Sequence, residues 1–157
     1  MKNFALGLFA LLSLTGCPSK ESSSSSGATS PAPVGSGPLA NLESQPSAPE
    51  QWTAQDGRAL PMVYFSGQNV RVSAGCKQPN GQLVCDAIRQ LRGAPPIEVS
   101  GRGSPSLSMG TKACMKMHYA YVTGRNSVGA EDGFCTFPDG SMVSAGALEQ
   151  YGVRVIQ

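Results

Sequence analysis

The cysteines and the single histidine are the most reactive side chains of this chain. Cys114 and His118 are four residues apart, so a helix would place them on the same face. A thiolate beside an imidazole is the pair that cysteine nucleophiles use. The favoured alternative is that Cys114 forms a disulfide and His118 is a half-exposed surface residue. A single histidine also excludes multi-histidine metal sites, so we expect no metal and no cofactor.

Acidic side chains are scattered and give one adjacent pair, Glu131 and Asp132. Both lie in a glycine-flanked stretch, which favours solvated turn residues over an acid/base pair. Asp139 belongs to a Pro-Asp-Gly turn, where a carboxylate accepts hydrogen bonds from nearby backbone N–H groups. We therefore expect no catalytic residue, although an enzyme could use His118 or an acidic pair as its acid/base group.

Aromatic residues are few, and three of them bear on binding. Trp52, Tyr119 and Tyr121 would offer a surface for stacking on a glycan. Core positions are the stronger expectation, because few other large side chains are available to fill the domain. The candidate binding residues are His118, Tyr119 and Tyr121.

Motifs and charges exclude several classes of function. The sequence has no Gly-x-Ser-x-Gly elbow, no phosphate-binding glycine-rich loop and no His-Glu-x-x-His helix. From residue 51 onward, ten Lys/Arg and seven Asp/Glu are scattered without a basic stripe. A nucleic-acid partner requires clustered positive charge, so none is expected.

Four cysteines follow residue 50: Cys76, Cys85, Cys114 and Cys135. An even number without a Cys-x-x-Cys motif indicates two disulfides in an oxidising compartment. Asn80-Gly81 is a turn sequence, and a two-residue turn there would place Cys76 opposite Cys85. The pairs Cys76–Cys85 and Cys114–Cys135 are therefore favoured over the other two connectivities.

Two stretches of the sequence resemble each other. Tyr64–Asn69 is matched by Tyr121–Asn126, and Cys76–Val84 is matched by Cys135–Val143. A short helical stretch and a glycine follow in each copy. The pattern predicts an α+β fold: a small disulfide-stapled domain of two repeated β-hairpin–helix units, about 62–99 and 119–156. We expect these units to superpose by an approximate two-fold rotation.

The N-terminal residues form a short apolar segment. Residues 4–14 are almost entirely apolar and are too few to span a bilayer core of about 30 Å. They end in Leu-Thr-Gly-Cys, with the cysteine at position 17. This sequence resembles the lipobox of bacterial lipoprotein signal peptides. The resemblance implies cleavage before Cys17, acylation with palmitate-type chains and attachment to a membrane. Pro18, where aspartate would signal inner-membrane retention, favours the outer membrane.

Composition divides the chain into three parts. Residues 1–16 are the expected signal peptide. Residues 17–50 contain the lipidated cysteine followed by many Ser and Pro residues with few large apolar side chains, which predicts a disordered tether. Residues 51–157 are the expected folded α+β domain.

The segment Gly133–Ser141 also resembles a known family. Its Gly-Phe-Cys-Thr-Phe-Pro-Asp-Gly-Ser sequence is similar to the core of a small exported Cys-rich bacterial domain that carries a haemolysin label but has no established function. A cysteine about twenty residues upstream in that family matches Cys114. Half of the family's cysteine pattern is missing, since Met142, Val143 and Val153 stand in that region. The resemblance implies a compact, disulfide-stapled envelope domain and no particular activity.

These observations predict an outer-membrane-anchored envelope lipoprotein that faces the periplasm or the cell surface. Its expected role is that of a non-enzymatic binding or structural module, with an envelope protein or a glycan as partner. The alternative is a cell-wall-acting envelope hydrolase that uses His118 or an acidic pair.

Overall fold

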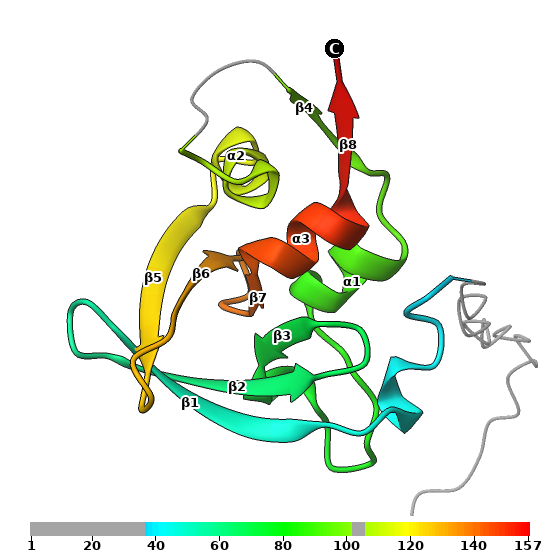
Figure 1. Ribbon diagram of the computed structural model, residues 1–157. Helices are drawn as coiled ribbons and strands as arrows, with labels where there is room; N and C mark the ends of the chain where they lie inside the picture. Colours follow the sequence, from blue (N-terminus) through cyan, green and yellow to red (C-terminus); the bar gives the residue numbers. More distant parts are fainter. Residues whose placement is uncertain (1–36, 102–105) are drawn as a thin grey trace, which may run out of the picture. The chain divides into compact units, whose positions relative to one another are not determined.

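The computed structural model of the protein describes residues 37–101 and 106–157. These residues form an α+β fold with eight strands and three α-helices (Figure 1). The strands are β1 (Ala48–Ala54), β2 (Ala59–Phe65), β3 (Val70–Ser73), β4 (Ile97–Ser100), β5 (Ala120–Asn126), β6 (Glu131–Thr136), β7 (Met142–Ser144) and β8 (Val153–Ile156). The helices are α1 (Asp86–Arg92), α2 (Met109–Lys116) and α3 (Ala145–Gly152), with short 3-10 helices η1 (Leu42–Ser44) and η2 (Ala74–Cys76).

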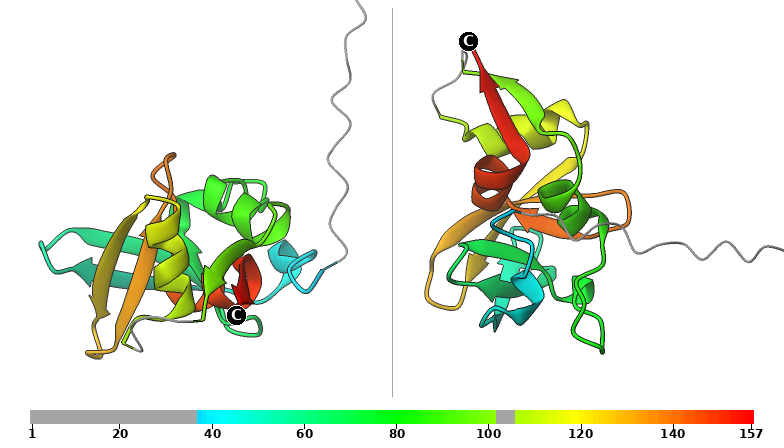
Figure 2. Two further views of the ribbon diagram at one scale, coloured as in Figure 1. Left: turned by 90° about the horizontal axis from the view of Figure 1, so that it is seen from above. Right: turned by 90° about the vertical axis from the view of Figure 1, so that its right-hand side faces the viewer.

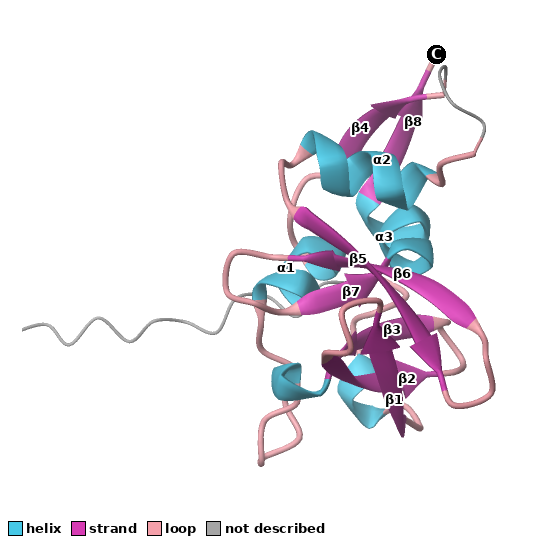
Figure 3. Ribbon diagram, turned by 90° about the vertical axis from the view of Figure 1, so that its left-hand side faces the viewer, coloured by secondary structure: helices cyan, strands magenta, loops and turns pink. Residues whose placement is uncertain are grey.

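Six strands close into a barrel in the order β1-β2-β3-β7-β6-β5. Every pairing in it is antiparallel. The barrel closes where β1 pairs with β5, from Trp52 opposite Asn126 to Ala54 opposite Gly124. Strands β4 and β8 form a separate parallel pair. Figures 1 and 3 show the helices between the barrel and this pair.

The barrel itself has two matching halves. The meander β1-β2-β3 corresponds to β5-β6-β7, and each counterpart begins 72 residues later in the chain: Ala48 and Ala120, Ala59 and Glu131, Val70 and Met142. The hairpin turns also match, since Gly57 and Gly129 both have φ of 83°. Figure 2 shows the tips of these two hairpins pointing away from the helices.

This arrangement corrects the predicted repeat units 62–99 and 119–156. Tyr64 lies in β2 whereas its predicted counterpart Tyr121 lies in β5, and the strand equivalent to β5 is β1. The main sheet is therefore one closed barrel and not two hairpin–helix units. The predicted match holds locally, because the turns at Gly81 and Gly140 have φ of 85° and 81° and are each followed by a helix.

Side chains pack on both sides of the barrel wall. Alternate residues point inward and fill the barrel: Trp52, Ala54, Leu60, Met62, Phe134 and Met142. The intervening residues of β2 and β3, such as Phe65 and Val72, join Leu91 and Leu148 of the helices in a second cluster outside it. The short strands therefore have apolar contacts on both faces over part of their length.

The folded unit begins before the predicted boundary at residue 51. Leu39 and Leu42 are buried in the outer cluster. The carboxylate of Glu43 accepts a hydrogen bond of 2.8 Å from Arg92, and this contact holds the pKa of Glu43 below its usual value. The predicted tether 17–50 is thus wrong for residues 37–50, because their few apolar side chains are the ones that are buried. Residues 17–36 lie outside the described residues.

The structure contains the disulfides Cys76–Cys85 and Cys114–Cys135, in the pairing predicted from the sequence. The turn that positions the first is one residue longer than expected. Lys77 pairs with Leu83 and Cys76 accepts from the backbone N–H of Val84, so Cys85 lies one residue beyond the hairpin register. The Cα atoms of Cys76 and Cys85 are nevertheless 5.2 Å apart. The second bridge joins α2 to β6.

We expect the two bridges to contribute unequally to stability. Replacing Cys114 and Cys135 by Ala should lower the free energy of unfolding by about 2–5 kcal/mol. Replacing Cys76 and Cys85 should cost about 0.7 kcal/mol less, because the loop they close spans 9 residues rather than 21. Urea unfolding of the two double variants measures this order, and a larger loss for Cys76–Cys85 would contradict it.

Candidate functional site

The structure does not form the thiolate–imidazole pair. Cys114 is fully buried and disulfide-bonded, while His118 is exposed and follows the helix instead of belonging to it. His118 has φ of 58°, its N–H donates to the carbonyl of Met115, and the N–H of Tyr119 donates to the carbonyl of Cys114. These two bonds are typical of an α-helix whose C-terminus is closed by a residue in the left-handed conformation. The position of His118 is thus explained by the end of α2.

Asp139 and Ser141 connect the second Pro-Asx-Gly turn to α1. The Asp139 carboxylate accepts from the backbone N–H of Asp86 at 2.8 Å, and the Ser141 hydroxyl accepts from that of Ala87 at 3.1 Å. Burial acts to raise the pKa of Asp139, but the N–H of Asp86 and the bonds from Ser141 hold it below its usual value. The motif that resembles the exported Cys-rich family therefore supplies an N-terminal cap to a distant helix.

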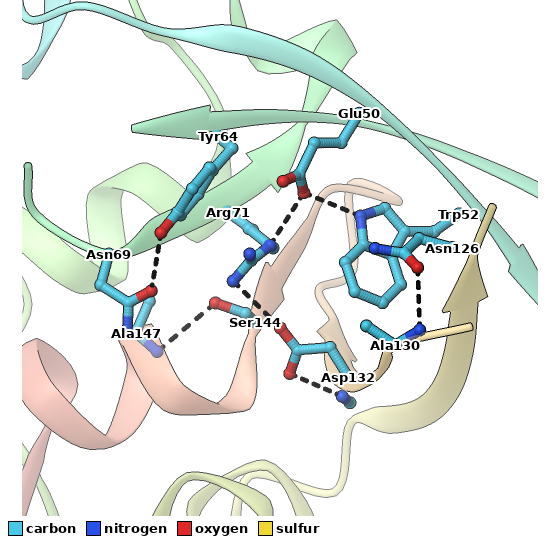
Figure 4. Close-up of polar contacts among 11 residues, drawn as sticks. Glu50, Trp52, Tyr64, Asn69, Arg71, Asn126, Ala130, Asp132, Ser144 and Ala147 are labelled. Carbon is cyan, nitrogen blue, oxygen red and sulfur yellow. Dashed lines mark hydrogen bonds and ion pairs between the residues drawn. The ribbon is translucent and has the colours of Figure 1, made fainter. Parts of the chain in front are cut away.

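A half-buried charged cluster lies at the barrel wall. The guanidinium of Arg71 on β3 donates to Glu50 on β1 at 2.8 Å and lies 3.5 Å from Asp132 on β6. It is stacked 4.0 Å from the ring centre of Tyr64 and 5.5 Å from that of Trp52. Figure 4 shows Arg71 between the two carboxylates, with the rings on either side. Side-chain exposures of 20–23% show that all three charges are partly desolvated.

Burial raises the pKa of Asp132 above its ordinary value of 3.8, and the charge of Glu50 acts in the same direction. The N–H of Gly133, which donates to the carboxylate at 2.8 Å, and the charge of Arg71 lower the pKa but do not cancel the effect of burial. Asp132 is therefore not the solvated turn residue that the sequence suggested. Its neighbour Glu131 does face solvent, where it pairs with Arg125.

Sequence reasoning missed this cluster. In β3, Arg71 lies on the face opposite to that of the buried Val70 and Val72. Glu50 was assigned to the tether and Asp132 to a loop, so neither was expected beside Arg71. Their meeting depends on closure of the barrel, which brings β1, β3 and β6 around one interior.

A groove of about 610 Å³ lies on the outer face of the seam between β1 and β5. Its lining reflects the match between the two halves of the barrel, because Gln51, Thr53 and Gln55 of one hairpin correspond to Thr123, Arg125 and Ser127 of the other. Apart from Arg125, these side chains form no hydrogen bond within the described residues. Arg125 is paired with Glu131, which also lines the groove. The groove therefore offers neutral donors and acceptors that are free to bind a ligand.

The three candidate aromatic residues separate in the structure. Trp52 is inside the barrel with 2% exposure and packs edge-on against Phe134, as expected of a core residue. Tyr119 is half-buried against Phe137. Tyr121 is 41% exposed on the outer face of β5, on the same side as Thr123 and Arg125. Only Tyr121 thus remains near the groove, while His118 lies at the end of α2.

No family model, no curated protein and no solved structure matches the chain. The similarity of Gly133–Ser141 to the exported Cys-rich family therefore remains a resemblance of one motif. Within residues 37–101 and 106–157, no three His, Cys, Asp or Glu side chains gather as metal ligands. No helix in the same ranges is long and apolar enough to cross a membrane. Cys17 lies outside the described residues.

The backbone at His118 predicts the effect of substitutions. His118→Gly should maintain or raise the free energy of unfolding, because glycine adopts positive φ without strain. His118→Val should lower it by about 1–2 kcal/mol, because a β-branched side chain is disfavoured there. Urea unfolding of the two variants makes the comparison. Equal losses would show that the imidazole itself stabilises the fold.

The environment of Asp132 predicts a pH dependence. A carboxyl whose pKa is raised in the folded state stabilises the fold below its unfolded pKa and loses that contribution as the pH rises through its folded pKa. As the pH rises from below 3.8 to neutrality, the free energy of unfolding of Asp132→Asn should therefore increase relative to that of wild type. Urea midpoints across this range provide the measurement.

Asp56→Asn is the matched control. The backbone N–H of Arg58 holds the pKa of Asp56 below its usual value, so this exposed residue should give the opposite trend. If Asp132→Asn instead loses stability with rising pH, attraction to Arg71 outweighs burial.

Proposed function

We propose that the protein is an envelope lipoprotein, anchored in the outer membrane through acyl chains on Cys17, and that its folded unit is a non-enzymatic binding module. The Leu-Thr-Gly-Cys sequence supports the anchor. The two disulfides support an oxidising compartment, because such bonds persist there and are rare in the reducing cytosol.

The observation that carries the binding role is the groove on the β1–β5 seam. It joins two hairpins whose outer faces present hydrogen-bonding groups without partners in the described residues. Its volume falls in the range of about 300–1,000 Å³ that is typical of ligand sites. The residues with the strongest chemistry, by contrast, already have structural partners: Cys114 in a disulfide, Asp139 at α1 and Arg71 between two carboxylates.

The alternative function is a cell-wall-acting hydrolase, and one observation favours it. Glu50 and Asp132 converge on Arg71 beside two aromatic rings, and burial raises the pKa of Asp132, as in many general acids. This pair would replace His118 and the Glu131–Asp132 pair considered from the sequence. Wall-degrading activity that is lost in Asp132→Asn but retained in His118→Gly would favour the enzyme over the binding module.

The anchor predicts covalent labelling at one residue. The full chain, expressed in a Gram-negative host with labelled palmitate, should incorporate the label and fractionate with the outer membrane. Cys17→Ser should abolish the labelling, because no other thiol has the lipobox context. Cys76→Ser is the matched control and should remain labelled. Labelling that survives Cys17→Ser would overturn the anchor.

A further inference from the structure

We propose that the β1–β5 groove, together with Tyr121, binds a neutral glycan strand. The inference rests on the proposed binding function and names its ligand class. The first observation concerns Tyr121 and Gly133. A Cβ atom on Gly133 would lie 1.8 Å from the Tyr121 hydroxyl oxygen and 2.4 Å from its Cζ atom. The end of the phenol ring therefore packs directly against the backbone of β6 at Gly133, where any other residue would place its Cβ atom.

The end of the Tyr121 ring reaches Gly133 on β6, which pairs with the groove residue Thr123. Tyr121 and Thr123 are two residues apart on β5 and point to the same face, so they are about 7 Å apart along the strand. The exposed ring is thus followed by the polar groups of Thr123, Gln55 and Thr53 along the seam. Figure 3 looks onto β5 and β6, with the helices at one end of these strands.

This combination matches the chemistry of a sugar. A pyranose ring has a face of C–H groups, which are attracted to the negative face of an aromatic ring, and a rim of hydroxyl groups that donate and accept hydrogen bonds. Gln51, Gln55 and Thr123 can both donate and accept. The one cation of the groove, Arg125, is paired with its one anion, Glu131, so the site has no net charge and favours an uncharged ligand.

Two other ligand classes fit less well. A peptide that binds by adding a strand needs a free sheet edge. At the groove the facing edges of β1 and β5 are occupied, since Trp52–Ala54 pair with Gly124–Asn126 and each strand has another partner on its other side. A nucleic acid or an anionic polysaccharide needs several unpaired cationic side chains, and Arg125 is the one cationic side chain among the residues that line the groove.

The test is a titration of the full chain, purified in detergent, with a chitin tetrasaccharide as the neutral probe. Calorimetry should show binding by wild type. Tyr121→Ala should weaken the affinity about three- to tenfold, because it removes the stacking surface. Tyr121→Phe keeps the ring and should change the affinity less than about twofold. Met115→Ala, which removes a side chain on α2 that is more exposed than Tyr121, should have no effect.

Gly133→Ala provides a second, independent variant. Its methyl group would displace the Tyr121 ring, so it should weaken binding about as much as Tyr121→Ala does. Adding Gly133→Ala to Tyr121→Ala should cause no further loss, because the ring that it displaces is already absent. Gln55→Ala, on exposed β-hairpin surface, should weaken binding about threefold or more without altering the fold.

Several results would overturn the proposal: no binding of the tetrasaccharide by folded wild type, binding that is indifferent to Tyr121 and Gln55, or stronger binding of a wall stem peptide or a sulfated glycan. These outcomes are independent of palmitate labelling at Cys17. If the protein is labelled but binds only peptide, the envelope lipoprotein proposal stands and the glycan proposal fails. If it binds glycan but is not labelled, the glycan proposal stands and the anchor proposal fails.

Discussion

Closure of the barrel between β1 and β5 is the constraint on which the other features depend. The closing strands approach each other where Gly124 has no side chain, and a Cβ atom there would lie 3.1–3.2 Å from Phe134 and Leu60. This space lets Trp52 and Phe134 pack edge to face at 5.4 Å inside the barrel. The same closure brings Glu50 and Asp132 to Arg71 on the inside, and forms the polar groove on the outside.

The fold compensates for a shortage of large apolar side chains. The barrel interior and the outer layer form separate clusters on the two sides of a thin wall. Both disulfides belong to the outer layer, where the short helices α1 and α2 would gain little from their own length. The N-terminal cap that Asp139 and Ser141 give to α1 serves the same end with polar groups. Covalent and polar contacts thus hold the helices where packing alone is sparse.

Local features of this fold could be predicted from the sequence, and distant ones could not. Neighbouring residues determine the alternation of Val70–Ser73, the helix Asp86–Arg92 and both Pro-Asx-Gly turns. β1 was missed because Pro49 and Glu50 are unusual in a strand and follow a Ser/Pro-rich stretch. Its assignment depends on partners in β2 and β5, which no short pattern reveals.

The same distinction applies to the candidate site. The cysteine pairing could be inferred from one turn and the even number of cysteines. The position of His118 could not, because the helix that carries Cys114 ends at Lys116 and leaves the imidazole beyond it. The contrast between exposed Tyr121 and buried Trp52 also required the structure, since it depends on which face of each strand lines the barrel interior. Gly133 was part of a family-like motif, but its role as space for a ring appears only in three dimensions.

The parallel pair β4–β8 has a consequence for the order of events as the chain grows. β4 ends at Ser100, and its partner in the described residues begins 53 residues later at Val153. A chain that emerges N-terminus first can therefore form the turn at Asn80-Gly81 and α1 while Ile97–Ser100 still has an open edge. During that interval the edge is exposed to other extended segments. Val153–Ile156 then pairs with the waiting strand, so this contact forms only after α2 and α3 have emerged.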